Sequence, residues 1–430
     1  MGDPAAHRAI EAVWRIESAR IIAGLTGLVR DVGLAEELAQ DALVAALEQW
    51  PADGIPPNPG GWLMVTAKHR AIDRIRRNER LREKLGQLGR ELEIQSAPDE
   101  FEAVLDSEAI NDDLLRLMFI SCHPVLSTPA RIALTLRLLG GLTTEEIARG
   151  FLAAEPTIAK RIVRAKQTLA DKRARFEVPP PAERQARLAS VLEVLYLIFN
   201  EGYSAMAGDD WMRPALCHEA LRLGRVLAGL MPDEPEVHGL VALMEIQASR
   251  MRARLSQDGL PVPLLEQNRG RWDQLLIRRG FAALLRAQSA SPGPYVLQAA
   301  IAACHARART ASETDWGAIA ALYDRLAMAA PSPVVELNRA VAVAMAEGPE
   351  RGLEIVDQLA AAPALAGYHH LPSVRGDLLA RLGRHDEAAA EFRRAAELTR
   401  NVPERTVLLR RANSPMLAWG EQDERGRPNP

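Results

Sequence analysis

Basic and hydroxyl side chains gathered on one short segment are the residues of this sequence best suited to bind a polyanion. Thr157, Lys160, Arg161 and Arg164 recur at helical spacing directly after a turn at residues 151–155. A guanidinium group can contact a guanine edge or a phosphate, and a good base contact contributes ~1–3 kcal/mol. The pattern predicts one helix face that contacts DNA, and the alternative is a face that is merely solvated.

A second basic segment begins with an aromatic residue. Aromatic rings beside basic groups suit single-stranded or melted nucleic acid, whose bases can stack on them. The alternative for Trp62 is core packing, and Asp73 within the segment is expected to be an internal salt-bridge partner. The candidate residues here are Trp62, Lys68, His69, Arg70, Arg74, Arg76 and Arg77.

Charge alternates along the first 175 residues. Residues 31–50 hold five acids and no Lys or Arg, and residues 60–90 hold nine bases against three acids. Residues 91–113 then hold nine acids and no base, and residues 156–175 hold seven bases against one acid. Phosphate neutralisation acts locally, so two separate basic blocks indicate two separate contacts with nucleic acid.

The elements that must position these groups have clear boundary signals. Residues 130–139 predict a helix that ends at Gly140 and Gly141. Thr143, or else Thr144, offers an N-cap, and Glu146 completes a capping box with Thr143. Pro156 then opens a helix, where its missing N–H costs nothing. This is typical of a helix-turn-helix whose second helix enters a major groove.

The first basic block is expected on a helix over residues 62–85, after a loop at residues 51–61 that contains four prolines and three glycines. An amphipathic helix over residues 34–50 should precede that loop. We expect Leu38, Ala42, Ala45 and Ala46 on its inner face, and Glu36, Glu37 and Asp41 on its outer face.

Composition predicts an all-α protein. The chain has 430 residues, with 48% hydrophobic and 25% charged residues, which suits a water-soluble protein of several domains. Each of the three cysteines precedes a histidine, but no close second ligand pair follows, so neither a metal site nor a cofactor is predicted. No catalytic constellation is apparent, so no enzyme is predicted. No signal peptide or membrane span is apparent either, so we expect a cytoplasmic protein with no membrane contact.

The C-terminal half has the signature of helical repeats. Leu382-Gly383, Ala388, Phe392 and Pro403 follow the spacing of a tetratricopeptide unit, and residues 333–360 match it more weakly. Small residues such as Ala388 let paired helices approach, and Phe392 should fill the space between repeats. A stiff Pro-rich linker at residues 177–185 precedes this half, which ends in a polar tail.

Residues from about 8 to 175 resemble the extracytoplasmic-function group of sigma-70-type sigma factors, on the motifs just quoted. Gly140-Gly-Leu-Thr-Thr-Glu-Glu-Ile-Ala and Arg161-Ile-Val-Arg-Ala-Lys166 are the best matches, and they resemble region 4. Residues 62–77 resemble the part of region 2 that melts and reads the −10 element. His69 departs from the Asn that relatives often carry, which puts its base contact in doubt.

The resemblance implies a sigma factor that binds core RNA polymerase, through the β′ clamp and the β flap, and promoter DNA. It assigns Glu37, Gln40 and Asp41 to the β′ clamp, the Trp62–Arg77 set to the −10 element, and the Thr157–Arg164 set to the −35 element. Residues 197–203, 299–305 and 332–341 resemble a subgroup with a long tetratricopeptide-like extension. In that subgroup the extension is expected to regulate, through a partner or an intramolecular contact.

The expected domains follow from these assignments. They are region 2 at residues 1–85, an acidic linker at 86–111, region 4 at 112–176, the Pro-rich linker at 177–185, a helical-repeat domain at 186–412 and a flexible tail at 413–430. Asn200, Glu201 and Tyr203 are expected to form a capped turn. The main alternative function is a one-component helix-turn-helix regulator with a ligand-sensing repeat domain, which would not need the first ~80 residues. An enzyme in the C-terminal half is the weaker alternative.

Overall fold

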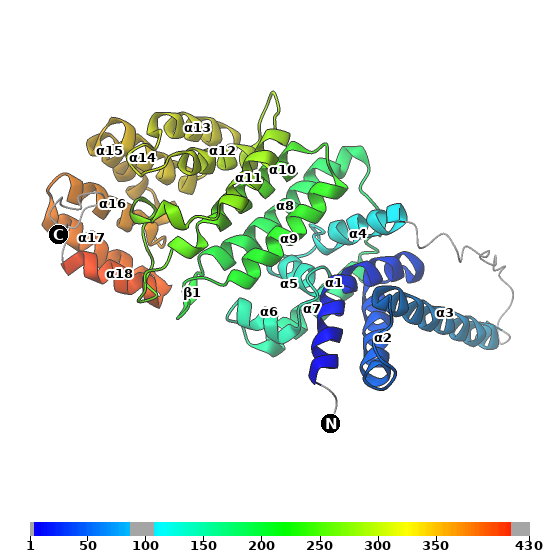
Figure 1. Cartoon of the computed structure of the whole chain (residues 1–430). Coiled ribbons are helices and arrows are strands. Elements are labelled where there is room, and N and C mark those ends of the chain that lie inside the picture. Colours follow the sequence, from blue (N-terminus) through cyan, green and yellow to red (C-terminus); the bar gives the residue numbers. More distant parts are fainter. Residues whose placement is uncertain (1–3, 87–106, 414–430) are drawn as a thin grey trace. The chain divides into compact units, whose positions relative to one another are not determined.

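The computed structural model describes residues 4–86 and 107–413, which fold almost entirely into helices (Figure 1). The one sheet in these ranges is a two-residue parallel pair. The all-α prediction is therefore confirmed. The chain divides into two compact units, Met1–Leu197 and Ile198–Pro430, and each is described separately.

The N-terminal unit is built from helices that each bury one apolar face. In α1, the buried residues include Ile10, Ile21, Ile22 and Leu25, which face α2, α3 and α4. The helices of this unit are α1 (Pro4–Val29), α2 (Val32–Asp53), α3 (Pro59–Gly86), α4 (Ser107–Ser121), α5 (Thr128–Leu138), α6 (Thr144–Gly150), α7 (Glu155–Asp171) and most of α8 (Pro181–Tyr203).

The loop between α2 and α3 is shorter than expected. Pro51 lies inside the last turn of α2, and Pro59 begins α3, so only residues 54–58 lie outside the helices. The missing N–H of Pro59 costs nothing at the first position of α3, whereas Pro51 gives up one i→i−4 hydrogen bond in the last turn of α2. Asn58 supplies the start of α3, since its Oδ1 accepts from Gly61 N at 3.0 Å.

Helix α8 begins at Pro181, inside the stretch expected to be a linker. Its first part packs on α4 and α5 of the same unit. Ser190 Oγ donates to the Cys122 carbonyl at 2.7 Å, Arg187 donates to the Phe119 carbonyl at 3.0 Å, and Arg131 of α5 pairs with Glu193 at 3.1 Å. Residues 181–197 therefore belong to the fold of the N-terminal unit.

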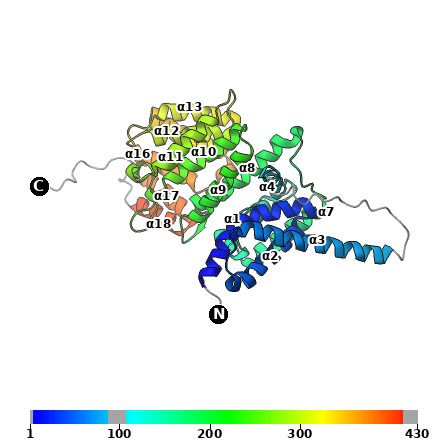
Figure 2. The same cartoon turned by 45° about the vertical axis from the view of Figure 1, so that its right-hand side comes forward.

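The C-terminal unit is a series of consecutive helices around α10. Twelve of the fifteen residues of α10 are buried, which is the pattern of a helix covered on all sides. Figure 2 shows α10, α11 and α12 alongside one another. The α-helices are α9 (Pro214–Leu230), α10 (Pro235–Ser249), α11 (Gln274–Arg286), α12 (Pro294–Arg307), α13 (Trp316–Ala329), α14 (Pro333–Glu347), α15 (Pro349–Ala360), α16 (His370–Arg381), α17 (His385–Leu398) and α18 (Val402–Asn413).

Short elements connect these helices. They are the strands β1 (Ala207–Gly208) and β2 (Arg400–Asn401) and the 3₁₀ turns η2 (Met251–Ala253), η3 (Leu264–Glu266), η4 (Arg269–Arg271) and η5 (Pro363–Leu365). The strands pair in parallel, and the Asn401 side chain donates to the Ala205 carbonyl at 3.0 Å and to the Asp210 carbonyl at 3.2 Å. This buried amide ties the last part of the chain to the segment that follows α8.

The residues singled out for a repeat lie inside a helix pair. Ala388 and Phe392 of α17 are buried at 0% and 1% exposure, and Phe392 lies against Gly376 of α16. The pair α14 and α15 is similar, because Gly352 lies against Ala344. Small residues thus let neighbouring helices approach closely. The name tetratricopeptide-like remains a prediction.

Candidate nucleic-acid interface

Helices α6 and α7, with the turn between them, form the expected helix-turn-helix. The capping box is present: Thr143 Oγ1 accepts from Glu146 N at 3.1 Å, and Glu146 Oε2 accepts from Thr143 N at 2.8 Å. The turn is closed by Ala153 N donating to the Ala148 carbonyl at 2.9 Å. Leu152 adopts a left-handed conformation with φ 46°, which reverses the chain within a few residues.

Helix α7 separates an apolar face from a basic one. Ile158, Ile162, Ala165 and Leu169 are buried against α5 and α6. Thr157, Lys160 and Arg164 are exposed and Arg161 is half-buried. Among the side chains of residues 9–77 and 111–413, no carboxylate oxygen lies within 4.0 Å of Lys160, Arg161 or Arg164. The basic face can therefore accept phosphate oxygens without first breaking an ion pair.

The basic residues of α3 have two kinds of surroundings. His69, Arg74, Arg76 and Arg77 are exposed. Lys68 is half-buried, and burial lowers its pKa while Asp113 of α4 partly offsets that effect. Arg70 lies 3.8 Å from Asp41 of α2, so one expected DNA contact and one expected polymerase contact touch each other.

Trp62 is only partly buried, and one side of it packs on α2. Its ring lies edge-on to Trp50, with ring centres 5.3 Å apart. Trp50 is 3% exposed and therefore belongs to the core. Trp62 thus packs on the core of this unit while the residue stays partly exposed, and its stacking on nucleic acid remains a prediction.

The acidic face of α2 differs from the sequence expectation at Glu36. Glu37 and Asp41 are exposed and Gln40 is half-buried, whereas Glu36 is only 3% exposed. The prediction that Glu36 faces outward is wrong. Its Oε1 accepts from Arg137 Nε of α5 at 2.6 Å and from Gln40 Nε2 at 2.7 Å, and its Oε2 pairs with Lys166 of α7.

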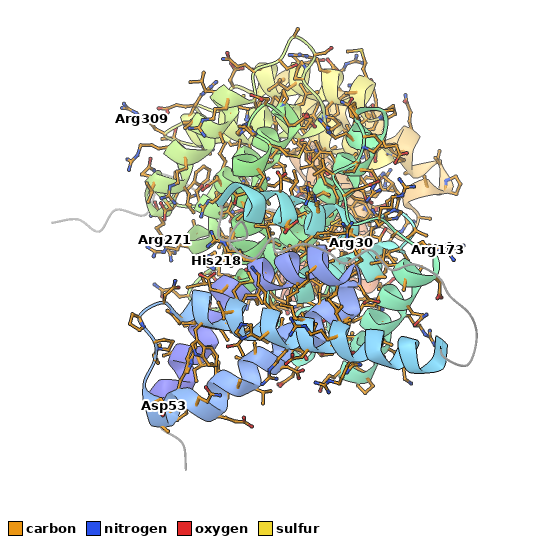
Figure 3. The ribbon with its side chains drawn as sticks, turned by 90° about the vertical axis from the view of Figure 1, so that its right-hand side faces the viewer. Arg30, Asp53, Arg173, His218, Arg271 and Arg309 are labelled. Atoms are coloured by element: carbon orange, nitrogen blue, oxygen red, sulfur yellow. The ribbon has the colours of Figure 1, made fainter. Side chains whose placement is uncertain are left out.

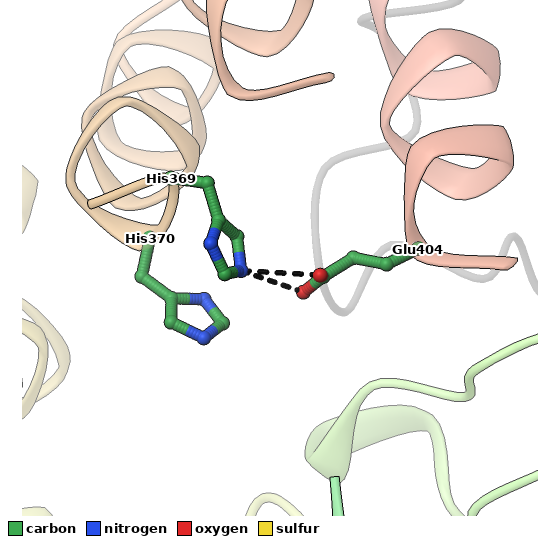
Figure 4. Close-up of side chains that lie close together, drawn as sticks. All are labelled: His369, His370 and Glu404. Carbon is green, nitrogen blue, oxygen red and sulfur yellow. Dashed lines mark hydrogen bonds and ion pairs between the residues drawn. The ribbon is translucent and has the colours of Figure 1, made fainter. Parts of the chain in front are cut away.

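Three side chains of the C-terminal unit could hold a metal ion: His369, His370 and Glu404 (Figure 4). The sequence argument missed this group because it considered only the Cys-His pairs, and Glu404 lies 35 residues from His369. The carboxylate is engaged by protein groups, since His369 Nε2 lies 3.1 Å away and Thr399 Oγ1 donates to it at 2.7 Å. These contacts join the start of α16 to the start of α18, so the group has a structural role.

The three thiols lie in different surroundings. Cys122 and Cys217 are buried and Cys304 is half-buried. Burial raises the pKa of Cys122 to about 11 and that of Cys217 to about 12. Cys217 lies against the Phe199 carbonyl at 3.4 Å, which is the contact of a packed thiol.

Family models match three parts of the chain. Residues 17–81 match Sigma-70 region 2, residues 116–169 match Sigma-70 region 4, and residues 187–288 match a family of unknown function, DUF6596. The first match includes the acidic face of α2 and the basic face of α3, and the second includes α6 and most of α7. The residues that carry the local chemistry therefore fall inside the two sigma segments.

The relatives match either most of this chain or about a third of it. The chain is 43% identical over 378 residues to Uncharacterized protein R00370 of Rhizobium meliloti (strain 1021), covering 87% of this chain and 88% of that protein. It is 28% identical over 158 residues to the ECF RNA polymerase sigma factor SigK of Mycobacterium sp. (strain KMS), covering 36% of this chain and 77% of that protein. The corresponding protein of Mycobacterium ulcerans (strain Agy99) is 27% identical over 147 residues, covering 33% and 74%. No solved structure matches the chain.

Proposed function

This chain belongs to the extracytoplasmic-function group of sigma-70 factors, and from that premise we propose how its residues divide the recognition of a promoter. Factors of this family are non-enzymatic initiation factors that bind core RNA polymerase and promoter DNA. One observation carries the assignment: the basic face of α7 has no ion-pair partner in the described part of the chain, while its opposite face is anchored in the core.

In this proposal α7 enters the major groove at the −35 element. Thr157 and Lys160 lie in the first turns of the helix, where recognition helices contact base edges. Arg161 and Arg164 follow on the same side. Each phosphate contact should contribute about −0.9 to the slope of a plot of log K against log salt concentration, where K is the binding constant for DNA.

At the −10 element, Trp62 would stack on an unpaired base while His69, Arg74, Arg76 and Arg77 follow the backbone. The partly accessible ring and four exposed side chains support this. Lys68 and Arg70 lie beside carboxylates of this unit, so we propose that they act by exchanging those partners for phosphates.

Glu37 and Asp41 would contact the β′ clamp, with Gln40 beside them, and region 4 would contact the β flap. The two acids are exposed on one face of α2, one helical turn apart. Neither is buried in a network, in contrast to Glu36. An exposed acidic face is the feature that a basic surface on a partner requires.

Run-off transcription with core polymerase tests the −35 assignment. Lys160→Ala and Arg164→Ala should each reduce transcription from a promoter that depends on its −35 element, by about tenfold for a contact of ~1.4 kcal/mol. The matched control is Lys172→Ala, an exposed base at the other end of α7. Equal losses for Lys172→Ala and Lys160→Ala would contradict the assignment.

We further propose that the C-terminal unit regulates this activity. Truncation at Pro181 is a poor test because it also removes Ser190 and Arg187. Their side chains donate hydrogen bonds to the Cys122 and Phe119 carbonyls of the N-terminal unit. Truncation after Leu197 keeps these contacts and removes the C-terminal unit. Unchanged transcription by the 1–197 chain, from the same promoters, would contradict a regulatory role.

The one-component regulator is not favoured, because residues 17–81 match Sigma-70 region 2, which such a regulator does not need. In the described ranges, no helix is both long and apolar enough to cross a bilayer. We propose a cytoplasmic location, where core polymerase and promoter DNA are found. Fractionation of cells that express a tagged chain would test it.

A further inference from the structure

The C-terminal unit contains a cavity of about 540 Å³ that the promoter-binding proposal does not use. Residues 250–267 and helices α14, α16 and α18 supply most of its lining. Apolar side chains such as Val262, Leu264, Val341 and Val374 form much of the wall, and Trp211 and Trp316 add aromatic surface. This volume and lining are those of a site for a small organic molecule.

Arginines give the cavity an unusual charge. Arg250, Arg254 and Arg381 all line it. Within residues 198–413, no carboxylate oxygen lies within 4.0 Å of any of the three. A buried charge without a counter-charge is costly to keep in a fold. Arg254 is buried and Arg250 and Arg381 are half-buried, so their grouping around one cavity needs an explanation.

Arg254 is the most deeply buried of these arginines, at 7% exposure. Its guanidinium carbon lies 3.4 Å from the ring centre of Tyr203 and 4.3 Å from that of Trp211. Burial lowers its pKa, and neighbouring Arg250 lowers it further. The Nε atoms of Arg250 and Arg254 are buried and have no hydrogen-bond partner among the described residues.

The remaining arginines have neutral partners. Arg250 Nη2 donates to the Tyr203 hydroxyl at 2.6 Å. Arg381 Nη1 approaches Met345 Sδ at 2.7 Å, and a thioether is a weak acceptor. Aromatic rings, a phenol and a thioether can orient guanidinium groups, but they do not neutralise them.

The carboxylates at the cavity do not offset this charge. Asp377 is paired with Arg411, and Glu404 is bound by His369 and Thr399. The cavity therefore keeps an excess of positive charge beside an apolar wall.

We propose that this cavity binds a small organic anion, with its oxyanion group held by Arg250 and Arg254 and its apolar body against the Val262 and Leu264 side. A guanidinium group binds carboxylate and phosphate oxygens in pairs, so either head group fits the same chemistry. Aromatic walls suit a flat ring in the body of the ligand. This inference concerns the C-terminal unit alone and does not depend on the promoter contacts proposed above.

The test uses the full chain and three probes of similar shape: benzoate, phenyl phosphate and neutral benzamide. Binding is measured by isothermal titration and by the rise in melting temperature, with each probe at up to ~20 mM, a range that detects millimolar affinity. We expect benzoate, phenyl phosphate or both to bind and benzamide to bind at least tenfold more weakly. The anion that binds identifies the head group as carboxylate or phosphate.

Two variants localise the site. Arg254→Met should weaken binding of the anion at least tenfold. Arg309→Met should bind like the wild type, because Arg309 is exposed on the same unit and lies at its outer edge (Figure 3). Absence of binding by both anions, equal binding of benzamide, or equal affinity of the two variants would each overturn the proposal. The comparison of anions with benzamide uses the wild-type chain, so it stands even if Arg254→Met fails to fold.

Discussion

Glu36 offers the sharpest test of the packing argument, because one carboxylate joins three helices of the N-terminal unit. Helix α2 carries it, and its partners Arg137 and Lys166 lie on α5 and α7. The Glu36 side chain is 4% exposed, whereas those of Arg137 and Lys166 are 23% and 22% exposed. The acid is thus shielded, and the two bases keep some access to water.

We expect Glu36→Gln to lower the free energy of unfolding of the N-terminal unit by about 3 kcal/mol. The amide keeps the shape of the side chain but leaves two cations without a counter-charge, and breaking a buried pair in this way costs ~3–5 kcal/mol. The lower end applies because water can reach Arg137 and Lys166. For a unit of this size, the same change corresponds to a melting temperature lower by roughly 6–12 °C.

Urea denaturation of wild type, Glu36→Gln, Lys166→Met and the double variant measures the effect. Because the two residues touch, we expect a coupling energy of ~1–3 kcal/mol in this cycle. Glu37→Gln is the matched control, since its side chain is exposed on the next position of α2, and it should change stability by less than ~0.5 kcal/mol. A Glu36→Gln variant as stable as this control, or an additive cycle, would refute the argument.

Three further predictions concern other parts of the chain. Asp41→Arg should abolish binding to core polymerase in a pull-down while leaving the melting temperature unchanged. The control Asp53→Arg, at the exposed end of α2, should bind normally. Normal binding by both variants would exclude the proposed docking face. Burial lowers the pKa of His305 to about 3, below its ordinary value near 6.5, so its contribution to stability is complete above pH 6.5 and is lost as pH falls. Urea titrations at pH 7 and pH 5 should differ by roughly 2 kcal/mol more for wild type than for His305→Phe, and equal differences would contradict the burial argument. Phe392→Ala should cost ~3–5 kcal/mol in the same measurement because the ring is 1% exposed, whereas a loss below ~1 kcal/mol would mean that the pair α16 and α17 is not held by this ring.

Features set by neighbours in sequence were predictable. The capping box of Thr143 and Glu146 spans three residues, and the buried stripe of Ile158 and Ile162 follows from helical periodicity. Both depend on local geometry alone. The helix-turn-helix could therefore be located from the sequence, together with the side chains on its outer face.

Features set by distant partners were not predictable. Glu36 was expected on the surface because its neighbours Glu37 and Asp41 are there, but its acceptor contact with Arg137 joins positions 101 residues apart. The arginines of the C-terminal cavity come from residues 250 to 411, and no local pattern marks them as one group. The C-terminal end of α2 was also predicted too early. The helix continues past Trp50 to Asp53, because the hydrogen bond lost at Pro51 falls in its final turn.

The unequal burial of the three thiols has a practical consequence for experiments on this protein. With pKa values of about 11 and about 12, Cys122 and Cys217 carry almost no thiolate near neutral pH, and the thiolate is the form that alkylating reagents attack. Cys304 is the one thiol of the described chain that keeps partial access to solvent. A maleimide dye should therefore label α12 first, giving the native sequence a single fluorescent reporter in the C-terminal unit without any engineered cysteine.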